Sequence, residues 1–219
     1  MLILAPLHDK LNFIRRFYDI ASEPFVITMR KIENHEEPYD QFDMVDEEPP
    51  FIVEWLDADE SLNILGKSCL CLLQNAFKNY LDGFVENYTY SLPKEAVGKT
   101  PSNMKGKNWF ERYRNYFLQV YGIDWTKSSI DILFLEEINF VRNDIQHGGV
   151  FYSLEHRQNA EYFKRFPASI FAEEWVTGGP GRVVVSKDNL FIAIQAIEDF
   201  CSYLEGEWER LAEWWVHPM

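Results

Sequence analysis

Cysteine and long apolar runs are scarce in this sequence. The 219 residues include three cysteines, and this small odd number does not build a disulfide framework. The longest near-apolar runs, such as 68–73, are far shorter than the roughly 20 residues that a membrane-spanning helix needs. The apolar start, 1–7, has no basic residues before it, unlike a signal peptide. We therefore expect a cytoplasmic protein without a membrane segment.

The common motifs for metals, phosphates and nucleophilic serine are also missing. The sequence has no C-x-x-C, no H-E-x-x-H, no G-x-x-x-x-G-K-[ST] loop and no G-x-S-x-G elbow. Cys69 and Cys71 fall on a predicted helix, where positions i and i+2 point about 200° apart, so they suit a core better than one zinc site. In the glycine-rich run 178–181, Pro180 removes an amide donor that a phosphate would use. We expect neither a metal nor a cofactor.

Basic residues are outnumbered by acidic ones, 21 to 35, which gives a formal net charge of -14. This balance disfavours a protein that coats nucleic acid without selectivity. The segment 33–50 holds eight of the acids and no Lys or Arg, and its prolines predict an exposed loop. The segment 94–127 is locally basic, and the cations at its centre are Lys105, Lys107, Arg112 and Arg114. These cations form either an ordinary solvated surface or a face that guides RNA.

Apolar residues recur with helical spacing over most of the chain. This pattern predicts five helices, at 7–20, 59–90, 109–121, 130–146 and 188–215, the last with a kink near Gly206. Strand signals are few and short, and they lie at 25–29, 51–55, 175–177 and 182–186. The last two flank the glycine-rich run and predict a β-hairpin over 175–186. The sequence thus predicts a single domain, 1–219, that is mainly all-α, a helical bundle with a small β appendage.

The run 142–147 closes the predicted helix 130–146 and holds a set of residues that can act on a phosphodiester. A histidine, His147, can take and give a proton near neutral pH, and an arginine, Arg142, can neutralise phosphate charge. Asn143 can orient either group or bind a ribose hydroxyl, and Asp144 can set the charge state of the other two. Together they suffice for metal-free transfer, in which a 2′-hydroxyl attacks the adjacent phosphorus.

A regular helix separates the two main groups of this run. Arg142 and His147 lie about 140° apart on either side of an apolar stripe. The stripe consists of Ile130, Phe134, Ile138, Val141 and Ile145. The two groups converge if the helix frays at the following glycines or if two copies of the chain pair. The segment 30–35 has the same Arg-to-His spacing, but it enters the acidic loop. The structural alternative for 142–147 is a helix end with a favourable histidine and glycine caps.

The run 136–149 resembles the signature of the HEPN superfamily (higher eukaryotes and prokaryotes nucleotide-binding). That signature is an arginine, a polar residue that is often asparagine, three further residues and a histidine, and the matching residues are Arg142, Asn143 and His147. The resemblance implies a helical bundle and, in many members, a metal-independent endoribonuclease with a composite site across a homodimer. Some toxins of the superfamily carry a tyrosine two residues after the histidine. This chain has Gly149 there, so control by nucleotidylation of that tyrosine is not expected.

On this resemblance we expect an RNA-cleaving enzyme, a toxin or phage-defence effector, whose products carry a 2′,3′-cyclic phosphate. His147 would serve as base or acid, Arg142 would bind the phosphate, Asn143 would orient them, and Asp144 would support them. The net negative charge indicates selectivity or restraint by an inhibitory protein partner. Two alternatives stay open: a non-catalytic HEPN-like module that dimerises or binds a nucleotide or a partner, and an unrelated helical interaction protein.

Overall fold

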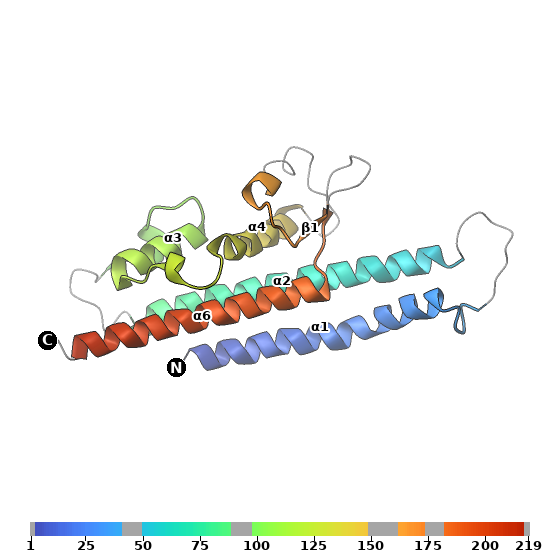
Figure 1. Cartoon of the computed structure of the whole chain (residues 1–219), viewed down its shortest axis with the longest axis horizontal. Coiled ribbons are helices and arrows are strands. Elements are labelled where there is room, and N and C mark those ends of the chain that lie inside the picture. Colours follow the sequence, from blue (N-terminus) through green and yellow to red (C-terminus); the bar gives the residue numbers. More distant parts are fainter. Residues whose placement is uncertain (1–2, 41–49, 89–97, 149–161, 174–181, 217–219) are drawn as a thin grey trace.

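Three long helices form the base of the molecule and two shorter helices lie above them (Figure 1). The computed structural model describes residues 3–40, 50–88, 98–148, 162–173 and 182–216. The base consists of α1 (Leu4–Glu33), α2 (Ile52–Tyr88) and α6 (Lys187–Val216). The upper layer holds α3 (Trp109–Tyr116) and α4 (Ile132–Gly148). The short connecting elements are η3 (Pro101–Asn103), the π-helical turn η4 (Phe117–Tyr121) and η5 (Trp125–Lys127). The fold class is all-α, as predicted.

Helical periodicity places the core of this bundle. On α1, the buried residues Leu7, Leu11, Ile14 and Tyr18 are spaced three or four positions apart and face α2 and α6. Aromatic rings fill the end of the bundle below α3. The ring of Phe84 lies 5.0 Å from that of Phe117 and 6.1 Å from that of Trp208, between centroids. This aromatic packing holds the upper layer on the base.

The two segments that were predicted as strands near the acidic loop are helical. The segment 25–29 lies inside α1, which continues through Pro24. In the segment 51–55, Phe51 has a φ of 62°, and the next residue, Ile52, starts α2. A short apolar run does not distinguish a strand from a buried helix, and both runs here extend long amphipathic helices. Trp55 Nε1 donates to Glu33 Oε1 at 2.9 Å and ties the two helices together at this end. Of the predicted acidic loop 33–50, Glu33 ends α1, 34–40 form turns, and 41–49 lie outside the described residues.

Within the described residues, the predicted β appendage consists of one short pairing. β1 (Ala172–Glu173) runs antiparallel to β2 (Arg182–Val183), with Ala172 opposite Val183. The predicted strand 175–177 and the glycine-rich run 178–181 lie outside the described residues. The predicted strand 182–186 ends at Val183, because the next residues pack on α2. Val185 N donates to Asn63 Oδ1 at 3.2 Å, and a Cβ at Gly66 would lie 1.9 Å from the Val185 carbonyl oxygen.

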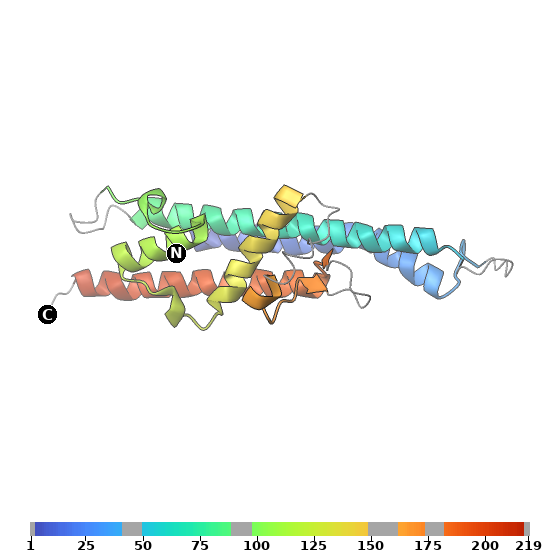
Figure 2. The same cartoon turned by 90° about the horizontal axis from the view of Figure 1, so that it is seen from above.

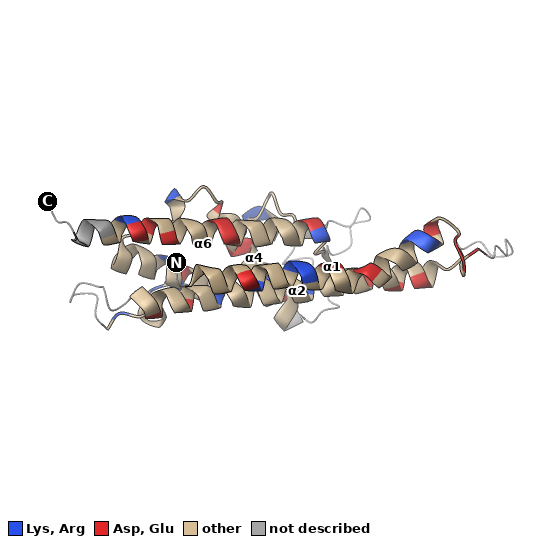
Figure 3. Cartoon of the chain, turned by 90° about the horizontal axis from the view of Figure 1, so that it is seen from below, with Lys and Arg blue, Asp and Glu red and all other residues tan. Residues whose placement is uncertain are grey.

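The five predicted helices are all present. The first and the last are longer than predicted at both ends, the second starts earlier and ends two residues sooner, and the fourth is shifted by two residues. The helix predicted at 109–121 changes from α to π geometry at Phe117 and stops at Gly122, whose φ is 73°. The kink predicted near Gly206 is wrong in that α6 runs as one helix. Among the described residues, no helix is both long and apolar enough to cross a membrane. Both signs of charge occur along α1, whereas the charged residues of α6 are mostly acidic (Figure 3).

Candidate functional site

Helix α4 crosses over α2, and its carboxyl end reaches the edge of the molecule (Figure 2). Of the stripe predicted from the sequence, Ile138, Val141 and Ile145 are buried, whereas Phe134 is half-buried and its neighbour Leu135 is buried instead. Ile130 lies before the helix starts but packs against the same core. Because this stripe fixes the rotation of α4, it also fixes where the polar run 142–147 stands.

A buried amide at the centre of α4 joins three helices. Asn139 Oδ1 accepts hydrogen bonds from Gln74 Nε2 of α2 at 3.2 Å and from Trp109 Nε1 of α3 at 2.7 Å. Asn139 and Gln74 are both buried, so each hydrogen bond satisfies a polar group that water does not reach. This contact sets the position of the motif helix relative to α2 and to the basic segment before α3.

Two buried acids hold the segment 162–171 against the other side of α4. Tyr162 donates its hydroxyl hydrogen to Glu137, and Arg165 forms an ion pair with Glu136 at 2.6 Å. Burial raises the pKa of the Glu137 carboxyl, while the hydrogen bonds from Ser169 and Tyr162 act in the opposite direction. Glu136 and Glu137 therefore serve as structural groups that hold the upper layer together.

Arg142 is held by two neutral amides, one from α4 and one from α2. Its NH1 donates to Asn143 Oδ1 at 2.9 Å, and its NH2 donates to Asn75 Oδ1 at 3.3 Å. Its Nε is buried and has no hydrogen-bond partner within the described part of the chain. A guanidinium has five N–H donors, so this half-buried side chain keeps donors and its full positive charge for an anion. The charge of Arg142 also acts on Cys71 of α2, whose pKa is raised by burial and lowered in part by the arginine.

The other predicted members of the site have different surroundings. Asn143 accepts from Arg142 and so orients it, as the sequence suggested. Asp144 is half-buried; burial raises the pKa of its carboxyl, and Lys67 of α2 partly offsets that rise. The cation that acts on Asp144 is therefore Lys67. Its predicted effect on the charge state of Arg142 or His147 stays a prediction.

His147 occupies the last turn of α4, which is continuous as far as Gly148. The side chain of His147 lies outside the described residues. The backbone alone decides one question that the sequence left open, because the helix does not fray before the glycines. Positions 142 and 147 are thus about 140° apart around one regular helix axis. Of the two routes to convergence, the pairing of two copies remains.

The four predicted RNA-binding cations lie in the same upper layer as α4 (Figure 1). Lys105 and Lys107 are exposed in the segment before α3, and Arg112 and Arg114 are half-exposed on α3. The backbone of this segment is fixed to α3. Asn115 Nδ2 donates to the Lys105 carbonyl at 2.7 Å, and Lys107 N donates to Glu111 Oε2 at 2.7 Å.

No metal site is built by the described residues. Within them, no group of three or more His, Cys, Asp and Glu side chains is arranged to hold a metal ion. Cys69 and Cys201 are buried thiols, and Cys71 is half-buried beside Arg142. Burial raises the pKa of Cys69 to about 11, so this thiol is a protonated core group near neutral pH.

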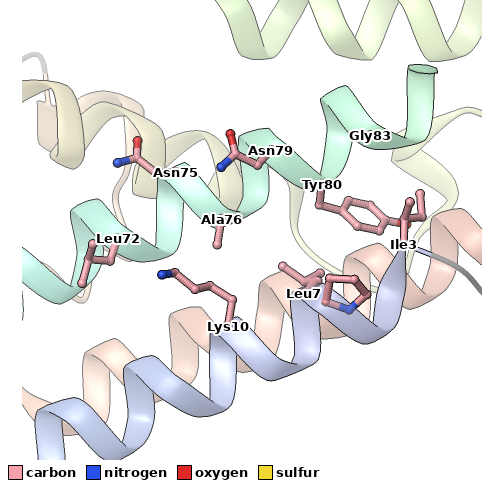
Figure 4. Close-up of a pocket in the computed structure, with 10 residues that line it drawn as sticks. Ile3, Leu7, Lys10, Leu72, Asn75, Ala76, Asn79, Tyr80 and Gly83 are labelled. Atoms are coloured by element: carbon pink, nitrogen blue, oxygen red, sulfur yellow. The ribbon is translucent and has the colours of Figure 1, made fainter. Parts of the chain in front are cut away.

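A groove that sequence reasoning missed opens between α1 and α2 next to Arg142. Its volume is about 520 Å³, and Leu7, Leu72 and Tyr80 contribute apolar walls (Figure 4). Asn75, which accepts from Arg142, stands on its rim. The missed contact joins residues 67 positions apart in the chain. The signal that could have found this region is the absence of acids from the middle of α2.

Comparison with known proteins identifies no relative of this chain. The chain matches no protein-family model, no curated protein and no solved structure.

Proposed function

We propose that this chain is a HEPN-like, metal-independent endoribonuclease that acts as a homodimer. The observation that carries the proposal is the state of Arg142, a half-buried guanidinium held by two neutral amides with donors to spare. A cation prepared in this way is suited to a phosphate, which it can meet through several N–H groups. The continuous end of α4 supports the dimer, because it places positions 142 and 147 on different sides of one helix.

The reaction requires one base, one acid and one cation. His147 takes the proton from a ribose 2′-hydroxyl, and the 2′-oxygen attacks the adjacent phosphorus. The new bond joins that oxygen to phosphorus while the bond from phosphorus to the 5′-oxygen breaks. The leaving 5′-oxygen then takes this proton from the protonated His147. Arg142 neutralises the charge that develops on the phosphoryl oxygens, and the products are a 2′,3′-cyclic phosphate and a 5′-hydroxyl.

The basic segment before α3 fits this role as a guide for RNA. Its cations attract phosphates over a distance that depends on salt, while the net charge of -14 repels RNA from most of the surface. This combination favours selective or restrained cleavage. A toxin or phage-defence effector, held by an inhibitory protein until needed, is a biological role consistent with it.

The test is RNA cleavage in the presence of EDTA by the wild-type chain and by two matched variants. His147→Ala should abolish cleavage, while His35→Ala, the histidine at the same spacing from Arg30, should cleave within twofold of wild type. Products should carry a cyclic phosphate, which mass spectrometry detects. Cleavage that needs a divalent metal, or that survives His147→Ala, would overturn the proposal. A folded dimer that binds RNA without cutting it would favour the non-catalytic binding module.

A mixing experiment tests whether two chains share one site. Arg142→Ala and His147→Ala are each inactive alone, but a mixed dimer holds one intact arginine and one intact histidine on different chains. We expect co-refolding of the two variants to restore cleavage. No recovery in verified mixed dimers would show that the two groups act within one chain.

A further inference from the structure

The middle of α2 holds the longest run of the chain without an acidic residue. The run 61–81 contains no Asp or Glu over 21 residues and carries Lys67 and Lys78. The whole chain has 35 acids in 219 residues, so about three would be expected in a run of this length. The first acid after the run, Asp82, is paired with Lys78 at 2.7 Å. An anion that approaches this part of α2 meets little repulsion.

The groove between α1 and α2 opens at this acid-free surface. Its volume of about 520 Å³ lies within the range of small-ligand sites. Leu7, Leu72 and Tyr80 line it, and Lys10 extends from α1 across it toward α2 (Figure 4). A concave apolar surface with a few polar groups is the usual form of a site for a ring-shaped ligand with a charged substituent.

Three polar side chains are available at this groove. Asn75 and Asn79 stand one turn apart on the α2 rim, and Lys10 supplies a positive charge from the opposite helix (Figure 4). Each amide offers both a donor and an acceptor, which suits a base edge or a ribose hydroxyl. Because Asn75 Oδ1 lies 3.3 Å from Arg142 NH2, the groove is one side chain away from the cation that we assign to the phosphate.

We propose that this groove receives the base and sugar of one unpaired nucleotide, whose phosphate lies on Arg142. The choice of RNA as the source of that nucleotide rests on the proposed function. The apolar walls cover the base, the two asparagines bind its edge or its ribose, and Lys10 adds to the attraction for the strand. Single-stranded segments fit this site, because only an unpaired base can leave its stack and enter the groove.

Gly83 lines the groove, so a larger side chain at this position can fill the groove and test whether a ligand binds there. A Cβ at Gly83 would meet only Ile3 Cγ2, at 3.7 Å, so a longer side chain has room to extend into the groove. Gly206 is the matched control, since it is an exposed glycine on α6 with nothing within 4 Å of an added Cβ. Gly83→Leu and Gly206→Leu both add the same side chain to a helix. Circular dichroism and thermal unfolding verify that both fold.

Binding is measured by calorimetry with 5′-AMP, CMP, GMP and UMP, with inorganic phosphate, and with a short unstructured RNA on the His147→Ala background. We expect Gly83→Leu to weaken binding of a nucleoside monophosphate and of the RNA at least tenfold, and Gly206→Leu to stay within twofold of wild type. Phosphate alone should bind more weakly than the nucleotides. Equal binding of phosphate and nucleotides, absence of nucleotide binding, or unchanged binding by Gly83→Leu would overturn the groove.

A charge substitution on the rim gives a second, independent variant. Asn79→Asp places a carboxylate at the groove, and Asn87→Asp places one on the same helix two turns beyond Asn79, outside the residues that line the groove. We expect Asn79→Asp to weaken nucleotide binding at least fivefold and Asn87→Asp to change it by less than twofold. Equal effects of the two substitutions would contradict a site at this rim.

The binding and cleavage measurements separate the two proposals. If the wild-type chain binds nucleotides in a Gly83-dependent way but does not cut RNA, the endoribonuclease proposal fails and the groove stands. If the chain cuts RNA and Gly83→Leu cuts and binds as well as wild type, the endoribonuclease stands and the groove fails.

Discussion

The chain contains an arginine followed five positions later by a histidine at the ends of two helices, α1 and α4. In the first, α1 ends at Glu33, so His35 lies beyond the helix with a φ of 51°. Arg30 is 58% exposed, and its NH2 lies 3.8 Å from a carboxylate oxygen of Glu36. In the second, α4 continues to Gly148, and among the described residues Arg142 donates to the amide oxygens of Asn143 and Asn75.

The difference between these two ends is the charge of the partners. Arg30 stands next to a carboxylate that offsets part of its charge, whereas Arg142 is oriented by amides that carry no charge. A guanidinium can therefore be fixed without being neutralised, and this is the condition for binding a phosphate. The spacing of arginine and histidine in the sequence does not distinguish the two ends, but the helices that pack against them do.

The largest expected effect is on RNA cleavage by the two arginine variants. Arg142→Ala should lower kcat/KM at least 100-fold, because the removal of one charged donor to a transition state typically costs about 10²–10³. Arg30→Ala should stay within twofold of wild type. Initial rates on one RNA substrate in EDTA measure both. Similar losses in the two variants would remove the distinction between the two helix ends.

The second effect is on the free energy of unfolding, and it compares a residue that fixes α4 with a residue that follows α1. Asn139→Ala should lower the free energy of unfolding by about 2–3 kcal/mol, because Gln74 and Trp109 lose their shared acceptor. Asn34→Ala removes an exposed contact with Glu36 and should cost less than about 0.5 kcal/mol. Urea unfolding gives both values. An Asn139 variant as stable as wild type would mean that α4 is not held through this amide.

The third effect depends on pH and concerns Asp144. Burial raises the pKa of this carboxyl above its unfolded value, so its contribution to stability is present at low pH and is lost as pH rises through the folded-state pKa. Asp144→Asn should therefore match wild type near pH 3 and become the more stable of the two toward pH 7. The gain should be smaller than the loss in Asn139→Ala. Urea midpoints across this pH range test the sign, and a variant that is less stable at pH 7 would show that the contact with Lys67 dominates.

The smallest effect compares glycine at the two histidines. His35 has left-handed backbone geometry, which glycine adopts without strain, so His35→Gly should raise stability by a few tenths of a kcal/mol. His147 lies in a helix, where glycine is unfavourable, so His147→Gly should lower stability by a similar amount. Thermal unfolding should show shifts of opposite sign. Shifts of the same sign would mean that lost side-chain contacts outweigh the backbone.

The helices could be predicted because each buries one apolar face, so apolar residues recur in the sequence with a period of about 3.6 residues. The helix ends were harder to predict, because the short apolar runs at 25–29 and 51–55 fit a strand as well as a helix. The long extension of α1 through Pro24 is favoured by its packing along α2, which no local pattern records.

The candidate site was predictable in part. Arg142 and Asn143 are neighbours in the sequence, and their hydrogen bond follows from that. Asn75 and the groove could not be predicted from the motif, because they come from α2 and depend on where α4 crosses it. The arrangement arises from tertiary packing, and the only trace of it in the sequence is a long run without acids.

The far end of the α1–α2 hairpin extends beyond the other helices as an arm (Figure 1). After Ser22, α1 buries only Ile32, and before Asn63, α2 buries only Ala58. So few anchors make the free energy of local opening small, and the amides of this arm should exchange hydrogen with solvent sooner than those in the middle of α2. The arm can open while the half that carries Arg142 stays folded. A force applied to the far end of this arm would therefore open the arm and leave the candidate site folded. The weakly anchored arm thus insulates one end of the molecule mechanically from the other.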